Sequence, residues 1–543
     1  MSFPLAKYAA QHWIIHAHSG SKATSQSALV SALMMKLLTE ENTALVNWVR
    51  LYDIDHNYGW SLRKKSIGIA GPLYYASLAG FTEASHALLK KGAVVNEKKG
   101  RCGNALQAAS DGGHEATVKL LIKKGANVNA QGGIYGNALQ AASYGGHEAI
   151  AKLLMEKGAK VNAKGGEYGN ALQAASYGGH EAIAKLLMEK GAKVNTEGGR
   201  YGNALQAASY EGHEAIAKLL IKKGANVNAQ GGMYGNALQA ASYIGHENVA
   251  KLLMEKEADV NAEGGHYGNA LQAASYQGHE AIAKLLMEKG ADVNAEGGYY
   301  GNALQAASYG GHEAIAKLLM EKGADVNAEG GKYGNALQAA SYGGHEAIAK
   351  LLIKKGANVN AQGGMYGNAL QAASCGCDEA IVRLLTEKRA DVNAQGGVYG
   401  NALQAASCRG HEATEKLLIK KGASVNAQGG VYGNALQAAS YGGHEAIAKL
   451  LIETGADVNA QGGVSGNALQ AASYIGHENV AKLLMEKGAD VNAEGGYYGN
   501  ALQAASDRGH ESIAKLLIKK GAVMNAKKGK YKNALQAAFK WRP

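Results

Sequence analysis

Apolar and polar residues follow one another along this chain in short blocks with the spacing of helices. In the stretch Gly136–Tyr168, residues 138–144 predict a first helix, and Asn137 is well suited to cap it because its side chain can accept from a free amide of the first turn. Two glycines then separate it from a second helix, which carries large apolar side chains on one face, namely Ile150, Leu153 and Leu154. Gly158 ends this helix. The pattern predicts a helix–turn–helix unit followed by a glycine-rich turn.

The same unit returns every 33 residues. The motif Gly-Asn-Ala-Leu-Gln-Ala-Ala-Ser first starts at Gly103 and last starts at Gly499, and no step contains an insertion. One helix pair cannot bury its own apolar face, but stacked copies form a continuous core in which Leu139, Ala142, Ile150, Leu153, Leu154 and Val161 take part. The sequence therefore predicts an all-α repeat solenoid. It consists of about 14 tandem units over residues 70–531, a helical N-terminal cap or linker segment over 1–69, and a partial C-terminal repeat over 532–543.

The repeated motifs Leu-Gln-Ala-Ala, Gly-His-Glu, Lys-Leu-Leu and Gly-Ala-Asp-Val-Asn-Ala resemble the ankyrin repeat throughout residues 70–543. This resemblance implies turn–helix–helix units stacked into a curved superhelix. The Thr-Pro-Leu-His opening of the family is here Asn-Ala-Leu-Gln. Gly132 replaces the usual aspartate of the hairpin, and Tyr135 stands where glycine is common. These departures leave the helix core as expected and put the geometry of the hairpin in question.

A second resemblance concerns the start of the array. Asn-Trp-Val-Arg-Leu-Tyr-Asp at 47–53 and Gly-Pro-Leu-Tyr-Tyr-Ala-Ser-Leu-Ala-Gly at 71–80 are similar to the junction in fungal NACHT–ankyrin proteins, the NLR-like (STAND) signal-transducing ATPases. In that family the ankyrin array is the sensor. The chain has no Gly-x-x-x-x-Gly-Lys-Ser/Thr phosphate loop, so ATP binding is not assigned to it. Either it is a standalone paralogue without the ATPase, or the gene model is truncated at its start.

The positive charge of the chain lies at its ends. Residues 1–102 hold 12 Lys and Arg against 6 Asp and Glu, and residues 507–543 hold 10 against 2, so the ends together carry +14 and residues 103–506 carry −3. A solenoid that binds nucleic acid is expected to carry a basic stripe along its length, so nucleic acid is not the expected main partner. The alternative is a binder of nucleic acid or of an anionic surface that uses the basic termini, in particular Lys527, Lys528, Lys530 and Lys532.

Composition and candidate chemistry point away from catalysis. Four cysteines make no disulfide framework, and no apolar run reaches the roughly 18–20 residues that span a bilayer, so we expect a cytoplasmic, monomeric protein, with the nucleus as an alternative. The recurrent Gly-His-Glu lacks the second histidine that a zinc helix needs. A thiolate site of Cys375, Cys377 and Cys408 would need His411 as a further ligand, and replacement of tyrosine by a small thiol explains the cysteines better. We expect no enzyme activity, no cofactor and no metal.

Comparison of the units shows which positions the fold leaves variable. The residue before the hairpin tyrosine changes in almost every unit: Ile134, Glu167, Arg200, Met233, His266, Tyr299, Lys332, Met365, Val398, Val431, Val464 and Tyr497. A stripe of tyrosines ends the first helices: Tyr144, Tyr177, Tyr210, Tyr243, Tyr276, Tyr309 and Tyr342, with further copies beyond. The resemblance places both sets on the concave, partner-binding face of an ankyrin array. For the tyrosines, packing between repeats and recognition of a partner both remain open.

These observations predict a scaffold that binds partner proteins through its hairpins and inner helices, as the sensor part of a fungal NLR-like system. The competing hypotheses are the binder with basic termini and a non-functional fragment of a larger NACHT–ankyrin protein.

Overall fold

The computed structural model describes residues 70–524, which form 28 α-helices and no strand. The chain divides into two compact units, residues 1–266 and 267–543, each of which is described by itself. The predicted cap over 1–69, the partial repeat over 532–543 and the terminal lysines lie outside the described residues. Within that described part, no helix is both long and apolar enough to cross a bilayer.

Both units repeat one short pattern, in which a first helix of seven or eight residues is followed by a second helix of nine. In the N-terminal unit the helices are α4 (Pro72–Leu78), α5 (Thr82–Lys90), α6 (Ala105–Asp111), α7 (Glu115–Lys123), α8 (Ala138–Tyr144), α9 (Glu148–Glu156), α10 (Ala171–Tyr177), α11 (Glu181–Glu189), α12 (Ala204–Glu211), α13 (Glu214–Lys222), α14 (Ala237–Ile244) and α15 (Glu247–Glu255).

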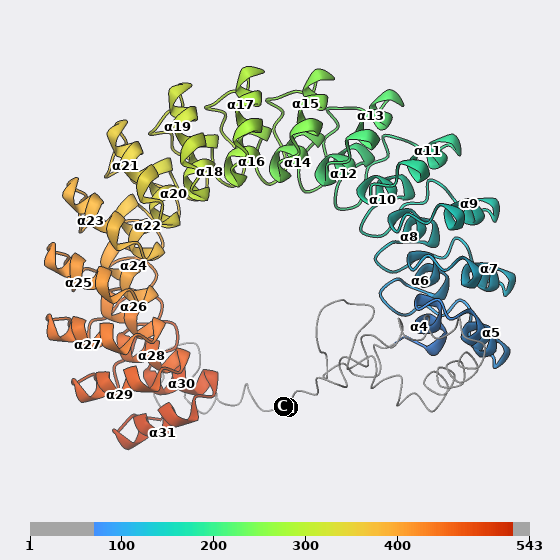
Figure 1. Cartoon of the computed structure of the whole chain (residues 1–543). Helices are drawn as coiled ribbons and strands as arrows, with labels where there is room; N and C mark the ends of the chain where they lie inside the picture. Colours follow the sequence, from blue (N-terminus) through green and yellow to red (C-terminus); the bar gives the residue numbers. More distant parts are fainter. Residues whose placement is uncertain (1–69, 525–543) are drawn as a thin grey trace, which may run out of the picture. The chain divides into compact units, whose positions relative to one another are not determined.

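In the C-terminal unit the helices are α16 (Ala270–Gln277), α17 (Glu280–Glu288), α18 (Ala303–Gly310), α19 (Glu313–Glu321), α20 (Ala336–Gly343), α21 (Glu346–Lys354), α22 (Ala369–Gly376), α23 (Glu379–Glu387), α24 (Ala402–Arg409), α25 (Glu412–Lys420), α26 (Ala435–Gly442), α27 (Glu445–Glu453), α28 (Ala468–Ile475), α29 (Glu478–Glu486), α30 (Ala501–Arg508) and α31 (Glu511–Lys519). In each unit the first helices form one row and the second helices form another (Figure 1).

The local rules read from the sequence are confirmed in the repeat of α8 and α9. Asn137 caps α8, since its side-chain oxygen accepts from the backbone N–H of Gln140 at 2.9 Å. Glu148 opens α9 at the positive end of the helix dipole. Gly158 follows the end of α9 with a φ of +86°, in the left-handed region that favours glycine.

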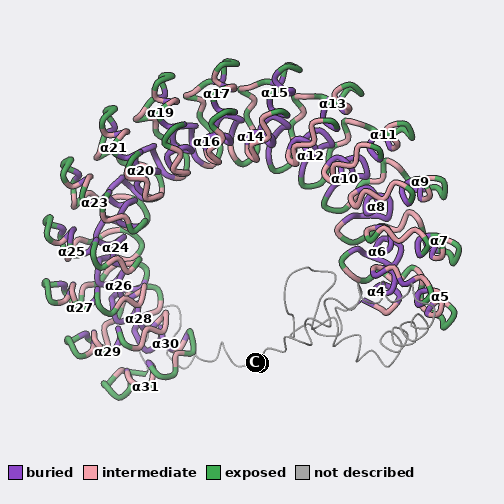
Figure 2. The backbone as a smooth tube through the Cα atoms, viewed as in Figure 1, coloured by how far each residue is buried: buried purple, intermediate pink, exposed green. Residues whose placement is uncertain are grey.

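The core lies between the two rows of helices and is made mostly of small residues. Leu139, Ala142, Ile150 and Leu154 are buried as expected. The expectation for Leu153 and Val161 was wrong, because both are only half-buried at the outer side of the core. Each first helix packs on the next one in its unit, for example α8 on α10 and α10 on α12. Figure 2 shows burial concentrated on the first helices, while the second helices have exposed ends.

The hairpin between two repeats is held by its glycines. The N–H of Gly165 donates to the carbonyl of Gly169 at 2.8 Å, which closes the turn. Gly166 has a φ of +68°, and a Cβ there would lie 2.3 Å from the carbonyl carbon of Tyr135 in the preceding hairpin. Glycine is therefore required at this position for two reasons: its φ is positive, and a side chain would collide with the preceding hairpin. The altered hairpin sequence is thus accommodated by close backbone packing between consecutive hairpins.

Candidate binding surface

Consecutive hairpins of each unit are joined by a ladder of backbone hydrogen bonds at the residue before the tyrosine, here called the hairpin-tip residue. In the N-terminal unit, the N–H of Glu167 donates to the carbonyl of Ile134 at 2.6 Å, and that of Arg200 donates to Glu167 at 2.8 Å. In the C-terminal unit, Met365 donates in the same way to Lys332 at 2.9 Å. The ladder uses only backbone atoms, so the side chain at each tip can change without loss of these bonds.

The predicted hairpin-tip residues differ in exposure. Glu167, Arg200, Met233 and His266 are exposed, whereas Ile134, Tyr299, Lys332 and Met365 are half-buried. Neighbouring tips contact one another within a unit. Arg200 Nη1 lies 3.3 Å from Glu167 Oε1, and the ammonium of Lys332 donates to the Tyr299 hydroxyl and lies 4.9 Å from the centre of that ring. The exposed ion pair of Arg200 and Glu167 contributes little to stability, so the fold does not depend on it.

In the repeats that carry both a hairpin tyrosine and a helix-end tyrosine, the two sets of rings interleave. The buried hairpin tyrosine Tyr168 lies between Tyr144 and Tyr177, with ring-centre distances of 4.8 Å and 5.1 Å. The C-terminal unit repeats the arrangement, with Tyr333 at 4.6 Å from Tyr309 and 5.6 Å from Tyr342. Burial raises the pKa of Tyr168 and Tyr333 above the ordinary tyrosine value, so their hydroxyls stay protonated at neutral pH.

The tyrosines of the predicted stripe therefore pack against neighbouring tyrosine rings and remain partly exposed. All seven members are half-buried: Tyr144, Tyr177, Tyr210, Tyr243, Tyr276, Tyr309 and Tyr342. Of the pairs above, Tyr309–Tyr333 is stacked and the other three are tilted, and aromatic pairs of this kind are worth about 0.5–1.5 kcal/mol beyond burial. The part that is not covered faces solvent beside the hairpin tips.

A buried glutamine that sequence reasoning passed over connects each first helix to the following hairpin. Gln305 Nε2 donates to the carbonyls of Ala328 at 3.1 Å and Gly334 at 2.9 Å, and its Oε1 accepts from the N–H of Asn302 at 2.7 Å. The sequence contains a signal for this role, because a glutamine recurs in the otherwise apolar segment Ala-Leu-Gln-Ala-Ala. A polar side chain kept on a buried face needs partners.

We expect Gln305→Leu to destabilise the C-terminal unit by about 1–3 kcal/mol, because it removes the hydrogen bonds to the Ala328 and Gly334 carbonyls and leaves the buried N–H of Asn302 without its partner. Urea unfolding followed by circular dichroism measures the loss, and hydrogen exchange of residues 328–334 locates it. Gln277→Leu is the matched control, since Gln277 is half-buried in a slot that holds Ile244 in another repeat. Equal losses from both changes would show that the bonds of Gln305 contribute nothing specific.

The recurrent histidine forms a hydrogen bond to the end of the first helix in the preceding repeat. His180 Nε2 donates to the carbonyl of Tyr144 at 2.8 Å, and His147 makes the same bond to Asp111 at 2.8 Å. Burial lowers the pKa of His180 below its usual value, and two neighbouring histidines lower it further. The fold thus favours the neutral ring, and this part of its stability is lost as the pH falls below about 6.5.

The asparagine of the Val-Asn segment completes the set of links between repeats. Asn129 Oδ1 accepts from the N–H of Lys160 at 2.8 Å, and its Nδ2 donates to the carbonyl of Gly158 at 2.9 Å. Asn162 makes the equivalent bonds to Lys193 and Gly191. The asparagines of the Val-Asn segments, the glutamines and the histidines therefore hold neighbouring repeats together, whereas Asn137 and its equivalents cap helices of their own repeats.

The cysteines are free thiols, and two of them take the place of helix-end tyrosines. Cys375 is buried and Cys408 is half-buried, and Arg409 Nε donates to Cys375 Sγ at 3.4 Å. Cys377 is exposed, with a φ of +69° in a slot that holds glycine elsewhere. Among residues 70–524, no group of three or more His, Cys, Asp and Glu side chains is placed to hold a metal ion.

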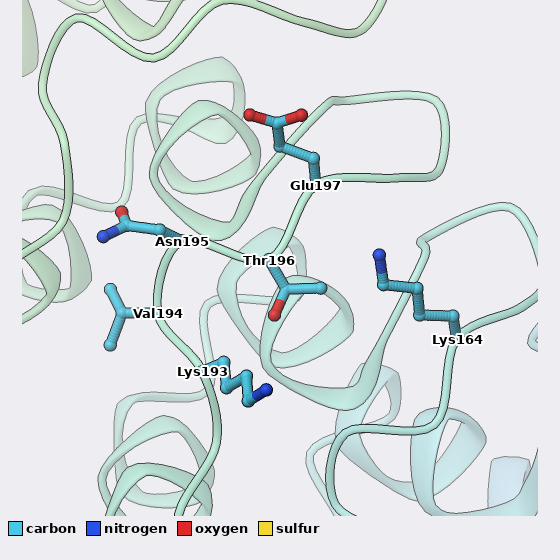
Figure 3. Close-up of a pocket in the computed structure, with 6 residues that line it drawn as sticks. All are labelled: Lys164, Lys193, Val194, Asn195, Thr196 and Glu197. Carbon is cyan, nitrogen blue, oxygen red and sulfur yellow. The ribbon is translucent and has the colours of Figure 1, made fainter.

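A shallow pocket in the N-terminal unit lies on the loops that follow the second helices. It is lined by Lys164, Lys193, Val194, Asn195, Thr196 and Glu197. In Figure 3 the Glu197 carboxylate and the two lysine ammonium groups point in different directions. The pocket residues thus form no convergent set of acid, base and nucleophile of the kind that catalysis requires.

Comparison with known proteins agrees with this architecture. The family model "Ankyrin repeats (3 copies)" matches residues 73–165, 138–231, 205–297, 238–330, 297–363, 369–462 and 462–528. The chain therefore belongs to the ankyrin-repeat family, whose members are typically non-catalytic scaffolds that bind proteins.

Two individual proteins are similar to parts of the chain. The azaphilone pigments biosynthesis cluster protein L of Monascus ruber is 38% identical over 130 residues, which are 22% of this chain and 26% of that protein. The match thus spans about a quarter of the relative's length. The crystal structure of the human ASB11 ankyrin repeat domain is 26% identical, with a TM-score of 0.36, over 40% of this chain and 98% of that domain.

Proposed function

We propose that this chain is a protein-interaction scaffold that binds partner proteins through its hairpin tips and the exposed edge of its tyrosine stripe. One observation carries the proposal: the recurrent polar residues are used in hydrogen bonds within and between repeats, whereas the tip side chains vary and the backbone ladder does not depend on them. A surface that varies on a constant backbone suits recognition. In this proposal, the hairpin tips from Ile134 to Met365 and the helix-end tyrosines from Tyr144 to Tyr342 form the binding surface.

A photo-crosslinking amino acid tests this surface. We expect the crosslinker at Arg200 or Met365 to form adducts with proteins in an extract of the source organism. The crosslinker at Lys218, an exposed position of the second helix α13, should form few or none. Adducts of equal yield from Lys218, or none from either tip, would contradict the proposal.

We further propose that the chain is the sensor part of a fungal NLR-like system. The resemblance of residues 47–53 and 71–80 to the NACHT–ankyrin junction supports this role, together with the array that follows. The predicted limits of the ankyrin array, at residues 69 and 531, are part of this proposal. Sequencing the 5′ end of the transcript tests it: a phosphate loop encoded upstream and in frame supports a receptor, and a stop codon in frame before any such motif counts against a fused ATPase.

A further inference from the structure

The hairpin tips of the C-terminal unit include an uninterrupted apolar strip, defined here as Met365, Val398, Val431 and Val464. Val398, Val431 and Val464 are 40%, 41% and 57% exposed, which is unusual for aliphatic side chains on an ordered backbone. The backbone ladder holds them in line, with N–H to carbonyl distances of 2.9–3.0 Å between consecutive members. The strip is thus a row of apolar side chains at fixed spacing.

The residue three places before each tip varies together with the tip. Every strip residue is preceded by an uncharged glutamine, at Gln362, Gln395, Gln428 and Gln461. Where the tip is charged or aromatic, as at Glu167, Lys332 and Tyr497, this position holds Lys or Glu instead. The strip is therefore neutral at both positions over four consecutive repeats.

The charges at the tip and helix-end positions beside the strip are positive, and the one acid at the position three places before the adjoining tip is Glu329. Lys332 precedes the strip as the adjoining tip. Arg409 is exposed at the end of α24, in the repeat that begins with Val398. From residue 332 to residue 475, neither the tip positions nor the positions after the helix-end tyrosine or cysteine hold an Asp or Glu. A partner with an acidic residue is complementary to this arrangement.

The period of the strip selects the conformation of the partner. We infer this period from the hairpin tyrosines directly after Met365, Val398 and Val431, whose ring centres are 6.3 Å apart for Tyr366–Tyr399 and 6.0 Å apart for Tyr399–Tyr432. Two residues of an extended chain advance by about 6.4–6.8 Å and return to the same side. Four residues of an α-helix advance by about 6.0 Å, but they rotate about 40° more than one full turn. The side chains of a helix at this spacing therefore point away from the strip after two or three contacts.

We propose that the strip binds an extended peptide segment of a partner protein, which has an apolar side chain at every second residue and an acidic residue facing Arg409. This inference rests on the proposed scaffold function and adds the chemistry of the partner. The apolar side chains of the peptide bury those of the strip, and the acidic residue pairs with Arg409. The backbone ladder keeps the strip in place before the peptide arrives, which lowers the entropic cost of binding.

A random 12-residue peptide library displayed on phage, selected against the full chain, tests the inference. We expect enriched peptides with apolar residues at alternate positions and at least one Asp or Glu. A synthetic copy of an enriched peptide should lose at least tenfold in affinity, by fluorescence anisotropy, for the variant with Val398→Glu, Val431→Glu and Val464→Glu. Arg409→Glu should weaken binding about tenfold, and a peptide whose acidic residue is replaced by lysine should recover it.

Ile518→Glu is the matched control, because Ile518 is an apolar residue of the same unit that is 47% exposed but lies on the second helix α31, outside the proposed surface. We expect this change to leave the affinity unaltered. Loss of binding in Ile518→Glu but not in the triple variant would overturn the inference while the scaffold function stands. Basic or helically spaced peptides, no enrichment at all, or no recovery after the charge exchange would also overturn it.

Discussion

The double variant Thr414→Ile and Glu415→Ala is expected to stabilise the C-terminal unit by about 3–5 kcal/mol at pH 8 and above, and by much less at pH 5. Glu415 is fully buried in α25, in the slot that holds the buried Ala349 in α21. Its carboxylate accepts a hydrogen bond from Ser407 Oγ at 2.9 Å. The variant gives α25 the sequence of α21, so the new side chains have a known packing arrangement in the same array.

The pH dependence follows from the carboxyl group. Burial raises the pKa of Glu415 to about 8, from 4.5 in the unfolded chain, although the bond from Ser407 partly opposes the shift. Between these values the folded state holds a proton that the unfolded state has released. Stability is therefore lost as the pH rises from 4.5 to 8, with a total cost of at most about 5 kcal/mol.

Urea unfolding followed by circular dichroism from pH 5 to pH 9 measures this effect. Hydrogen exchange of the α25 amides assigns it to the right repeat, since long arrays need not unfold in one step. Glu415→Gln is the control, because it keeps the shape of the side chain and removes its titration. If the Glu415→Gln protein keeps the wild-type pH dependence over this range, Glu415 is not its source.

Gly331→Ala is expected to destabilise the C-terminal unit by about 3 kcal/mol or more, whereas Gly323→Ala should cost only about 1 kcal/mol. Both glycines have a positive φ, +59° for Gly331 and +89° for Gly323. A Cβ at Gly331 would lie 2.3 Å from the carbonyl carbon of Tyr300, while a Cβ at Gly323 meets nothing within 4 Å. The difference between the variants therefore measures the close packing of two hairpins.

The chain itself shows that the slot of Gly323 tolerates side chains. Glu257 and Arg389 occupy it in other repeats, with φ of +62° and +64°. Urea unfolding gives the two free-energy losses, and hydrogen exchange of residues 330–334 shows whether the hairpin ladder opens. Similar losses for the two variants would mean that backbone conformation alone accounts for the requirement at Gly331.

Sequence reasoning was most successful where the cause is local. The helix limits, the cap at Asn137 and the stop at Gly158 depend on a few neighbouring residues, and they were confirmed. The variable slots were also found from the sequence, because comparison of near-identical units reveals them directly. Binding at Ile134, Glu167 and the other slots stays a prediction, since no partner contacts them here.

Other features depend on contacts about 30 residues apart and could not be read in the same way. Gln305 is unremarkable within its own helix, and its role appears only when the following hairpin is folded against it. The half-burial of Leu153 likewise depends on how the second helices are spaced. Helical periodicity gives the direction of a side chain but not the distance to the next element.

The amino-acid sequence by itself determined the repeat, its 33-residue length, its helix pairs and its stacking, because a unit that cannot bury its apolar face alone must stack on copies of itself. Only the tertiary structure decided that the hairpin tips are linked by backbone bonds and that the tyrosines stack face to face. It also brought the exposed Val398, Val431 and Val464 into one row with the half-buried Met365. The physical reason is that spacing between repeats is set by close backbone contacts across the interface, which no single repeat contains.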